Sequence, residues 1–550
     1  MRMATDADVL LIGSGAGGLG AALALARAGL RVTICEAHEI PGGYSQSFTL
    51  DGLRFSPGIH YLGELGPGEP LRRIYEGLGL GGELEFCELA PRSYVHITLG
   101  QRTYPLVKGR AALEAHLAEE FPAEAAGIGG YLDQVQRIGR VLRGDGLQLV
   151  TDRAALGALG PWAHRTGQHL IEAHVGDRTL RGVFGAIAGE YGLAPSLAPA
   201  PVHALTVCHY LEGAYYPRGG GGGLVKAMVR AFKRAGGQLR LSAPVARILT
   251  DEHRVAGVEL LDGTRLHARH VVSNADPGVT WRSLLAGHPA AQAARERLSR
   301  ARWSLSTLSF FLALDRSPAA WGLDSGNHWL FPDEDVDGAF RSIAGASLET
   351  LADGPLFLSF PTLKDPSLPR GGRHTLEAFT YAPWPLFDRW RDTTPEARGA
   401  EYDAFKRRAL DRVLSRAEYL LPGLRDHLTF GNVATPLTSA GFVRASQGHM
   451  YGLEKNPLQV GGASFPVRPD VEGLDGLWLC GAGTLTHGIH GATLSGLVAA
   501  AGILGVGVAD LLTGDRPVTV HPSDDLSAWP PELQQEIRSR APASRSPLPA

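Results

Sequence analysis

The stretch from Val9 to Tyr61 reads VLLIGSGAGGLGAALALARAGLRVTICEAHEIPGGYSQSFTLDGLRFSPGIHY, and it decides the fold. Its first four residues, 9–12, are apolar, as is typical of a buried strand. A glycine-rich turn and an apolar helix, expected from about Gly17 to Arg27, come next. A second apolar run from Val32 to Cys35 then ends on the acid Glu36. This order predicts a βαβ unit.

Three glycines in this unit, Gly13, Gly15 and Gly18, have the G-x-G-x-x-G spacing of a dinucleotide-binding turn. Gly13 permits the tight turn, Gly15 lets the backbone approach a pyrophosphate, and Gly18 lets the helix pack closely on the strand. The start of the helix then offers free N–H groups to phosphates. Glu36 lies 18 residues after Gly18, where an acid accepts hydrogen bonds from a ribose hydroxyl. An acid here argues against a ribose 2′-phosphate, which leaves NAD and FAD.

A second glycine loop follows the acid, with the sequence Ala37-His38-Glu39-Ile40-Pro41-Gly42-Gly43-Tyr44-Ser45. This loop resembles the extended N-terminal signature of FAD-dependent amine oxidases and carotenoid desaturases. In those proteins the loop runs along the ribityl chain toward the flavin. The resemblance therefore implies FAD as the cofactor.

Length and composition place few limits on the function. The 550 residues allow two or three domains or one large interleaved domain, and the contents of 44% hydrophobic and 20% charged residues are ordinary. The net charge of −3 gives no electrostatic reason to expect nucleic acid as a partner. Four scattered cysteines show neither a C-x-x-C pair nor metal-ligand spacing. They predict buried thiols, no metal site and a reducing, cytoplasmic environment.

Two segments bear on membrane contact. Residues 496–512 form an apolar run of 17 residues that contains Asp510, which is too short for a span and predicts a buried helix. The segment 111–199 reads mainly helical and carries an amphipathic, partly basic stripe at Tyr131, Val135, Ile138 and Leu142. Such a stripe covers a core or lies on a membrane surface, and peripheral membrane contact stays open as an alternative.

The rest of the chain predicts further parts of the same site. Five glycines from Gly219 to Gly223 open a helix, but no Lys-Ser/Thr follows as a P-loop requires. Strands are expected at 303–314, 329–331, 356–360 and 375–381, and they suggest a separate antiparallel sheet that walls an apolar cavity or is ordinary core. Near the C-terminus, residues 477–483 read as a strand entering a glycine turn before the apolar helix.

The whole chain resembles the FAD flavoprotein superfamily of phytoene desaturases, carotenoid isomerases and retinol saturases, which are amine-oxidase-like. Three blocks carry this resemblance: 9–61, 216–277 and 476–500. Where many related flavoproteins have Gly-Asp, this chain has Gly481-Ala482, so backbone groups must replace that carboxylate. The FAD contacts expected from the motifs and this resemblance are Gly13, Ser14, Gly15, Ala16, Gly17, Gly18, Glu36, Ala37, Gly42, Gly43, Tyr44, Ser45, His60, Tyr61, Val245, Asn274, Ala275, Gly481, Ala482, Gly491, Ala492 and Thr493.

The fold expected is α/β, with a Rossmann-type FAD-binding domain interleaved with a substrate domain of mixed sheet and helices. The discontinuous FAD-binding domain is expected to comprise 1–110, 200–295 and 455–514. The substrate-binding region is expected at 111–199 and 296–454, and residues 515–550 are expected to be a loosely ordered tail rich in Pro, Ser and Arg.

The resemblance implies redox chemistry at the carbon–carbon bonds of a polyene or isoprenoid lipid: desaturation, saturation or isomerisation. His60 and His490, and beside them His487, are candidate acid–base residues, since a histidine exchanges protons near neutral pH. A structural hydrogen bond is the alternative for each. No second G-x-G-x-x-G follows an apolar strand-like run as the first one does, so electrons are expected to pass to or from a quinone, oxygen or a redox protein. Flavin amine oxidation and non-catalytic binding of a prenyl or lipid group remain alternative functions.

Overall fold

A computed structural model describes residues 5–144, 146–147, 149, 153–251, 253–460, 464–471 and 473–540 of the chain. Its organising element is a five-stranded parallel sheet in the order β19-β13-β1-β2-β9. The strands are β1 (Val9–Ile12), β2 (Val32–Cys35), β9 (Gln238–Arg240), β13 (His270–Ser273) and β19 (Leu477–Leu479). The predicted βαβ unit is thus confirmed, and strands from much later in the chain extend it on both sides.

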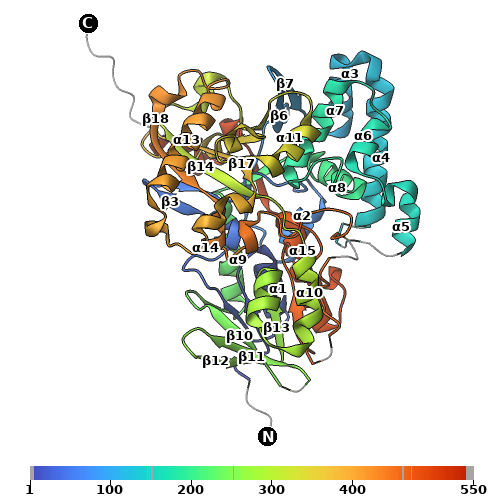
Figure 1. Cartoon of the computed structure of the whole chain (residues 1–550), viewed down its shortest axis with the longest axis vertical. Coiled ribbons are helices and arrows are strands. Elements are labelled where there is room, and N and C mark those ends of the chain that lie inside the picture. Colours follow the sequence, from blue (N-terminus) through green and yellow to red (C-terminus); the bar gives the residue numbers. More distant parts are fainter. Residues whose placement is uncertain are drawn as a thin grey trace.

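Three helices pack beside this sheet in the lower half of Figure 1: α1 (Ala16–Arg27), α9 (Gly221–Arg234) and α15 (Gly488–Leu504). Helix α1 is apolar throughout, and every residue before Arg27 is buried. Helix α15 is also largely apolar and packs against α1, but the predicted buried helix 496–512 extends only to Leu504, because Gly505 ends it with a φ of +71°. Among the described residues, none of the helices combines the length and apolar character needed to cross a bilayer.

A seven-stranded mixed sheet fills the upper part of Figure 1, in the order β18-β14-β17-β16-β15-β6-β7. Its strands are β6 (Val95–Leu99), β7 (Arg102–Leu106), β14 (Ser306–Leu314), β15 (Asn327–Phe331), β16 (Leu356–Ser359), β17 (His374–Ala382) and β18 (Leu428–Ala434). The four predicted strands pair antiparallel, while β6 pairs parallel with β15. The hairpin β6–β7 therefore belongs to this sheet. From the sequence, these residues are expected in the FAD-binding domain, within 1–110.

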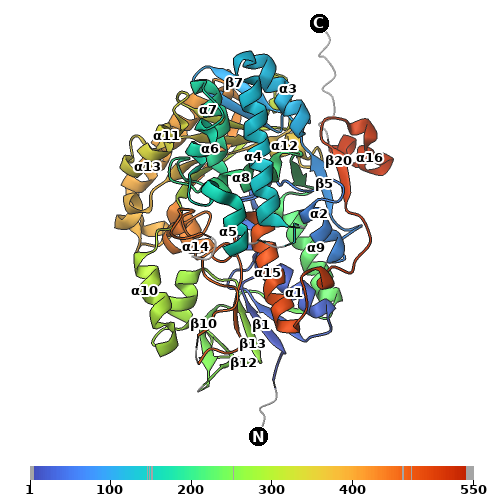
Figure 2. The same ribbon diagram turned by 90° about the vertical axis from the view of Figure 1, so that its right-hand side faces the viewer.

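A helical region covers one side of the molecule, at the upper right of Figure 1 and in front in Figure 2. It contains α3 (Arg110–Glu120), α4 (Ala125–Arg143), α5 (Arg153–Leu159), α6 (Gly167–Glu172), α7 (Arg178–Gly185) and α8 (Ala200–Tyr210). The amphipathic stripe of α4 is buried against this region's own core. The apolar face that could have met a membrane is therefore used inside the protein.

The C-terminal segment is more ordered than the sequence predicts. Strand β20 (Thr519–Pro522) pairs with β5 (Glu85–Glu88), which in turn pairs with β8 (Tyr215–Pro217). Helix α16 (Pro531–Arg540) follows, and Trp529 is buried against His521. Residues 515–540 are thus not the loose tail expected, because backbone pairing and an aromatic anchor hold them. Residues 541–550 lie outside the described part.

The remaining elements connect these layers. Two small antiparallel sheets are β3 (Phe48–Leu50) with β4 (Leu53–Phe55), and β10 (Val245–Thr250), β11 (Val255–Leu260) and β12 (Arg265–His267). The other helices are α2 (Pro70–Gly77), α10 (Gln292–Arg300), α11 (Val336–Ser342), α12 (Pro361–Lys364), α13 (Gly399–Ala417) and α14 (Pro436–Phe442).

Candidate active site

A cavity of about 860 Å³ lies where the parallel sheet, the seven-stranded sheet and the helical region meet. Nearly all of the predicted FAD contacts line it, although they come from five separate segments of the chain. These residues are Gly13, Ser14, Gly15, Ala16, Gly17, Glu36, Ala37, Gly42, Gly43, Tyr44, Ser45, His60, Tyr61, Val245, Asn274, Ala275, Gly481, Ala482, Gly491 and Ala492. The cavity extends from the glycine turn that follows β1 to residues of helices α4, α5 and α8.

The first glycine turn is shaped by contacts that exclude a Cβ. Gly13 ends β1 with a φ of +91°, in the left-handed region that favours glycine. A Cβ on Gly17 would lie 2.8 Å from the carbonyl oxygen of Ala492 and 2.9 Å from the amide nitrogen of Gly481. The start of α1 therefore meets the C-terminal turn at backbone contact distance.

Two predicted FAD contacts, Gly18 and Thr493, do not line the cavity. A Cβ on Gly18 would lie 2.2 Å from the carbonyl oxygen of Gly13, so this glycine lets helix and strand pack closely. Thr493 is fully buried, and its Cγ2 would lie 3.1 Å from a Cβ on Gly20. Both residues pack elements together beside the cavity, and for Gly18 this is the role that its spacing predicts.

The predicted ribose acid is tied to both glycine loops through one serine. The backbone N–H and the hydroxyl of Ser14 donate to Glu36 Oε2 at 2.8 and 2.6 Å. The same hydroxyl accepts the N–H of Gly42 at 3.0 Å. A Cβ on Gly43 would lie 3.6 Å from Gly15 Cα, so the second glycine loop faces the first. Glu36, the first glycine turn and the second glycine loop are thus joined by hydrogen bonds through Ser14.

These residues fit FAD. The carboxylate of Glu36 suits a ribose diol, and the first N–H groups of α1, beside Gly15 and Gly17 on the cavity wall, suit a pyrophosphate. Val245 and Asn274 close the same end of the cavity. The N-terminus of α15, with its positive dipole end, lies on the cavity wall at Gly491 and suits an electron-rich ring.

His60 is held in place by the substrate sheet. Its Nδ1 lies 3.1 Å from Glu377 Oε2, and Glu377 also accepts the N–H of Ser56 at 2.7 Å. The carbonyl oxygen of His60 accepts a hydrogen bond of 2.6 Å from the ammonium of Lys364, which is fully buried on α12. The imidazole reaches the cavity, but one of its nitrogens already serves the contact between the loop and β17.

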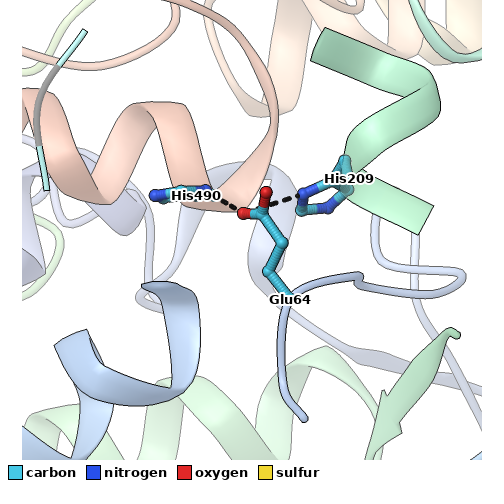
Figure 3. A group of neighbouring side chains, drawn as sticks. All are labelled: Glu64, His209 and His490. Atoms are coloured by element: carbon cyan, nitrogen blue, oxygen red, sulfur yellow. Dashed lines mark ion pairs between the residues drawn. The ribbon is translucent and has the colours of Figure 1, made fainter. Parts of the chain in front are cut away.

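His490 belongs to a buried cluster with Glu64 and His209, shown in Figure 3. Its Nδ1 lies 2.5 Å from Glu64 Oε2, and Nδ1 of His209 lies 3.2 Å from the same oxygen. The guanidinium of Arg143, from α4, pairs with Glu64 Oε1. Sequence reasoning missed Glu64, His209 and Arg143 because they are up to 426 positions from His490 and share no motif.

Hydrogen bonding argues against a metal centre in this cluster. Nε2 of His209 accepts the N–H of Gly63 at 3.0 Å, so the proton of the neutral ring sits on Nδ1, which lies 3.2 Å from Glu64 Oε2. The lone pair that a metal would need on Nδ1 is therefore used. Burial lowers the pKa of His490 to about 3, with a further contribution from Arg143. His490 is neutral at physiological pH and has a structural partner.

His487, the third candidate, caps α15. Its Nε2 donates to the carbonyl oxygen of Glu190 at 3.0 Å. Burial lowers its pKa to about 3, and the nearby ammonium of Lys455 acts in the same direction. His487 is thus also neutral, and it fixes the backbone of Glu190.

Glu190 is a cavity residue that sequence reasoning missed. It ends a short helical turn, Ala186–Glu190, and its carboxyl group lies beside Tyr61, Tyr210 and Trp329. Burial raises its pKa. A signal existed, since Glu190 is the single charged residue between Arg181 and Glu212. A lone acid in so apolar a stretch is a functional candidate.

The half of the cavity beyond Glu190 is apolar. Its walls come from the helical region and from the seven-stranded sheet. They include Leu142, Leu149, Leu156, Leu159, Val202, Leu205, Phe357 and Phe379. A hydrocarbon chain suits such walls, and the few polar groups among them would fix its position.

Comparisons with known proteins agree with this geometry. The family model described as flavin containing amine oxidoreductase matches residues 16–504. The all-trans-retinol 13,14-reductase of Danio rerio is 28% identical over 533 residues, covering 92% of this chain and 87% of the relative. The lycopene-forming phytoene desaturase of Paracoccus sp. is 29% identical over 509 residues, covering 90% and 95%. An oxidoreductase structure from Methanosarcina mazei superposes with a TM-score of 0.61 at 17% identity, covering 89% and 99%, which shows the shared fold.

Proposed function

Since the chain belongs to the flavin-containing amine oxidoreductase family, we propose that it is an FAD-dependent oxidoreductase acting on carbon–carbon bonds of a polyene or isoprenoid lipid. The observation that carries this proposal is the single cavity, which joins the Glu36 and glycine-turn end to a wall of leucine and phenylalanine side chains. The two relatives named above act, by name, on all-trans-retinol and phytoene.

Each end of the cavity has its own task. Glu36, Gly15 and Gly17 would hold the adenosine and pyrophosphate part of FAD, and the start of α15 would lie by the flavin. When bound, FAD supplies transfer of a hydride to or from carbon. The apolar half excludes water and orients the substrate, whose binding comes from buried apolar area at about 25 cal/mol per Å².

Amine oxidation is the second candidate, and one observation favours it. The rings of Tyr61 and Tyr210 stack at 4.4 Å beside the Glu190 carboxyl group. Aromatic faces with a carboxylate are a site that can bind an ammonium ion. Against this, burial raises the pKa of Glu190, which disfavours the ionised form that would pair with an ammonium ion.

The experiment is an anaerobic panel of carotenoids, retinoids, fatty acids and amines, with free FAD as the control. The FAD-loaded protein is mixed with each compound in its oxidised form, and flavin bleaching identifies electron donors. The chemically reduced protein is mixed in parallel, and return of the yellow absorbance identifies acceptors. We expect polyenes alone to react in one of the two directions. Reaction with amines alone would contradict the proposal, as would a protein that takes up no FAD.

The electron partner is proposed by elimination within the sequence. Gly77, Gly79 and Gly82 repeat the G-x-G-x-x-G spacing, but they follow helix α2 and precede strand β5, so they lack the strand–turn–helix setting of a second dinucleotide site and a dedicated NAD(P)H domain is not expected. We propose a quinone, oxygen or a redox protein as the partner that exchanges electrons with the flavin. Adding each to the reduced, FAD-loaded protein and timing its reoxidation identifies the competent one.

A further inference from the structure

We propose that Glu190 is the proton donor of this site, and that the protein saturates a carbon–carbon double bond of its polyene. The inference rests on the proposed function and adds a direction and a catalytic residue to it. Its basis is the placement of one carboxyl group in the cavity wall, between aromatic hydrogen-bond donors and the apolar half of the cavity.

The hydrogen bonds engage one carboxyl oxygen of Glu190 more strongly than the other. Oε1 of Glu190 accepts from the hydroxyl of Tyr61 at 2.5 Å and from the indole N–H of Trp329 at 3.1 Å. Oε2 lies 3.5 Å from the hydroxyl of Tyr210, longer than an ordinary O–H···O hydrogen bond. Because Oε1 is occupied by two donors, the acid proton belongs on Oε2.

Burial favours the protonated form of this carboxyl group. Removal from water raises its pKa, although the donors Tyr61, Trp329 and Tyr210 and the ammonium of Lys364 oppose that effect. The titratable groups that face it from the packed elements are Tyr61, Tyr94, Tyr210, Tyr381, Tyr451 and Lys364. The pKa of each of these tyrosines is raised by burial, so they stay neutral donors.

The backbone beneath Glu190 is rigid. The hydroxyl of Tyr381, from β17, donates to the carbonyl oxygen of Gly189, and His487 donates to that of Glu190. Two parts of the fold thus hold the residue from different sides. A proton donor needs such fixation because transfer occurs only at hydrogen-bond distance from the reacting atom.

Competing donors are less suited to the role. His487 and His490 have pKa values of about 3, so neither is protonated at neutral pH. One nitrogen of His60 is engaged with Glu377. Glu190 alone among these cavity residues combines a transferable proton with two fixed hydrogen bonds to its other oxygen.

The proposed step balances as follows. When bound and reduced by two electrons, FAD would supply the hydride for one carbon of the double bond, and Glu190 Oε2 would give the proton to the neighbouring carbon. The π bond would break and two C–H bonds would form, so that the polyene is reduced and the hydride donor is oxidised. Glu190 is left as a carboxylate and regains a proton from solvent. A two-electron donor, such as a quinol or dithionite, restores the reduced cofactor.

The test compares Glu190→Gln and Glu190→Asp with Glu119→Gln, a control that removes an exposed carboxylate on α3. Each FAD-loaded protein is reduced and mixed anaerobically with all-trans-retinol in D₂O. Wild type and E119Q are expected to form a saturated product with deuterium at both carbons of the former double bond, because the N–H of reduced FAD exchanges with D₂O as the proton of Glu190 does. E190Q is expected to be slower by about 100-fold or more, with E190D recovering part of the rate. FAD and polyene binding should be unchanged in all of them.

A second measurement separates a proton donor from a structural residue. In the FAD-free protein the infrared spectrum should contain the C=O band of an un-ionised carboxyl group, and E190Q should lose it while E119Q keeps it. An E190Q protein that saturates the polyene at the wild-type rate would overturn the inference. So would a wild type that only desaturates or isomerises polyenes, although the proposed function would stand. Failure to bind FAD would overturn both.

Discussion

At the scale of single residues, the shape of the cofactor site depends on how closely the backbone at Gly17 approaches the backbone at Gly481 and Ala492. The atoms nearest a Cβ on Gly17 would be a side-chain oxygen of Asn274 and two backbone atoms of the C-terminal turn, all within 2.9 Å. Backbone atoms cannot rotate away as a side chain can, so no other residue type fits here. The site therefore requires glycine for space and not for an unusual φ.

Gly17→Ala is expected to destabilise the protein by about 2–3 kcal/mol and to abolish FAD uptake, because α1 must move away from Gly481 and Ala492. Chemical unfolding and FAD fluorescence quenching measure the two effects. Gly157→Ala is the control, since a Cβ there meets nothing within 4 Å. It should bind FAD normally and change stability by less than about 1 kcal/mol. Normal FAD binding by G17A would contradict the packing argument.

The buried Lys455 leads to a prediction about how stability depends on pH. It lines the cavity, and burial lowers its pKa from 10.5 to about 8. The folded state thus disfavours the charged form, and the resulting destabilisation is complete below about pH 8 and disappears as the pH rises toward 10.5. Lys455→Met should raise the free energy of unfolding of the FAD-free protein by about 2–3 kcal/mol at neutral pH.

That gain should fade in alkaline buffer, which urea titrations at several pH values would show. Lys226→Met, at an exposed position of α9, is the control and should change stability by less than about 0.5 kcal/mol at every pH. A gain for K455M that did not depend on pH would contradict the lowered pKa of Lys455.

How far single residues could be predicted depends on whether their signal is local. Gly13, Gly15 and Glu36 could be predicted because spacing along the chain alone defines their geometry. Glu64 and His209 could not, since an isolated Glu and an isolated His carry no spacing. Glu190 could be predicted in part. Its apolar neighbours in the sequence single it out as a candidate, but they do not indicate which residues contact it.

At the scale of elements, Glu64 connects helices α4, α8 and α15 through its side chain. It sits in a loop, almost fully buried, and pairs with Arg143 at the end of α4, His209 on α8 and His490 on α15. It therefore fixes the helical region to the helix that starts at the cofactor site. Removing one partner of a buried ion pair leaves the other charge uncompensated.

Glu64→Gln is accordingly expected to lower the free energy of unfolding by about 3 kcal/mol, because the buried Arg143 loses its carboxylate. Urea unfolding followed by tryptophan fluorescence measures this. Glu83→Gln, which removes an exposed partner of Arg230 and Arg234, should cost less than about 1 kcal/mol. Equal effects of the two substitutions would show that the Glu64 cluster does not join the elements.

Sequence patterns predicted most elements but not all of their neighbours. The βαβ unit and the strands of the large sheet follow from local periodicity, and the structure has them within a few residues of the expected bounds. The parallel pairing of β6 with β15 joins residues more than 200 positions apart, and no local pattern encodes it. The strand β20 was missed because its partner β5 lies at the other end of the chain.

At the scale of the whole molecule, the chain crosses between its two halves several times. The parallel sheet alone combines strands from residues 9 to 479, and the seven-stranded sheet combines strands from 95 to 434. The cavity lies where these halves meet, so neither half contains a complete site. The central claim is that this one cavity holds FAD and a polyene side by side.

The most direct measurement is a spectroscopic titration of the FAD-loaded protein with all-trans-retinol, using wild type, Leu205→Trp and Leu197→Trp. Leu205 lines the apolar half, whereas Leu197 is exposed outside the cavity lining. We predict one polyene bound per FAD, with changes in both spectra, for wild type and L197W. L205W should keep the normal FAD spectrum and bind polyene at least about tenfold more weakly. Polyene binding that is unaffected by L205W, or that leaves the flavin spectrum unchanged, would contradict the claim.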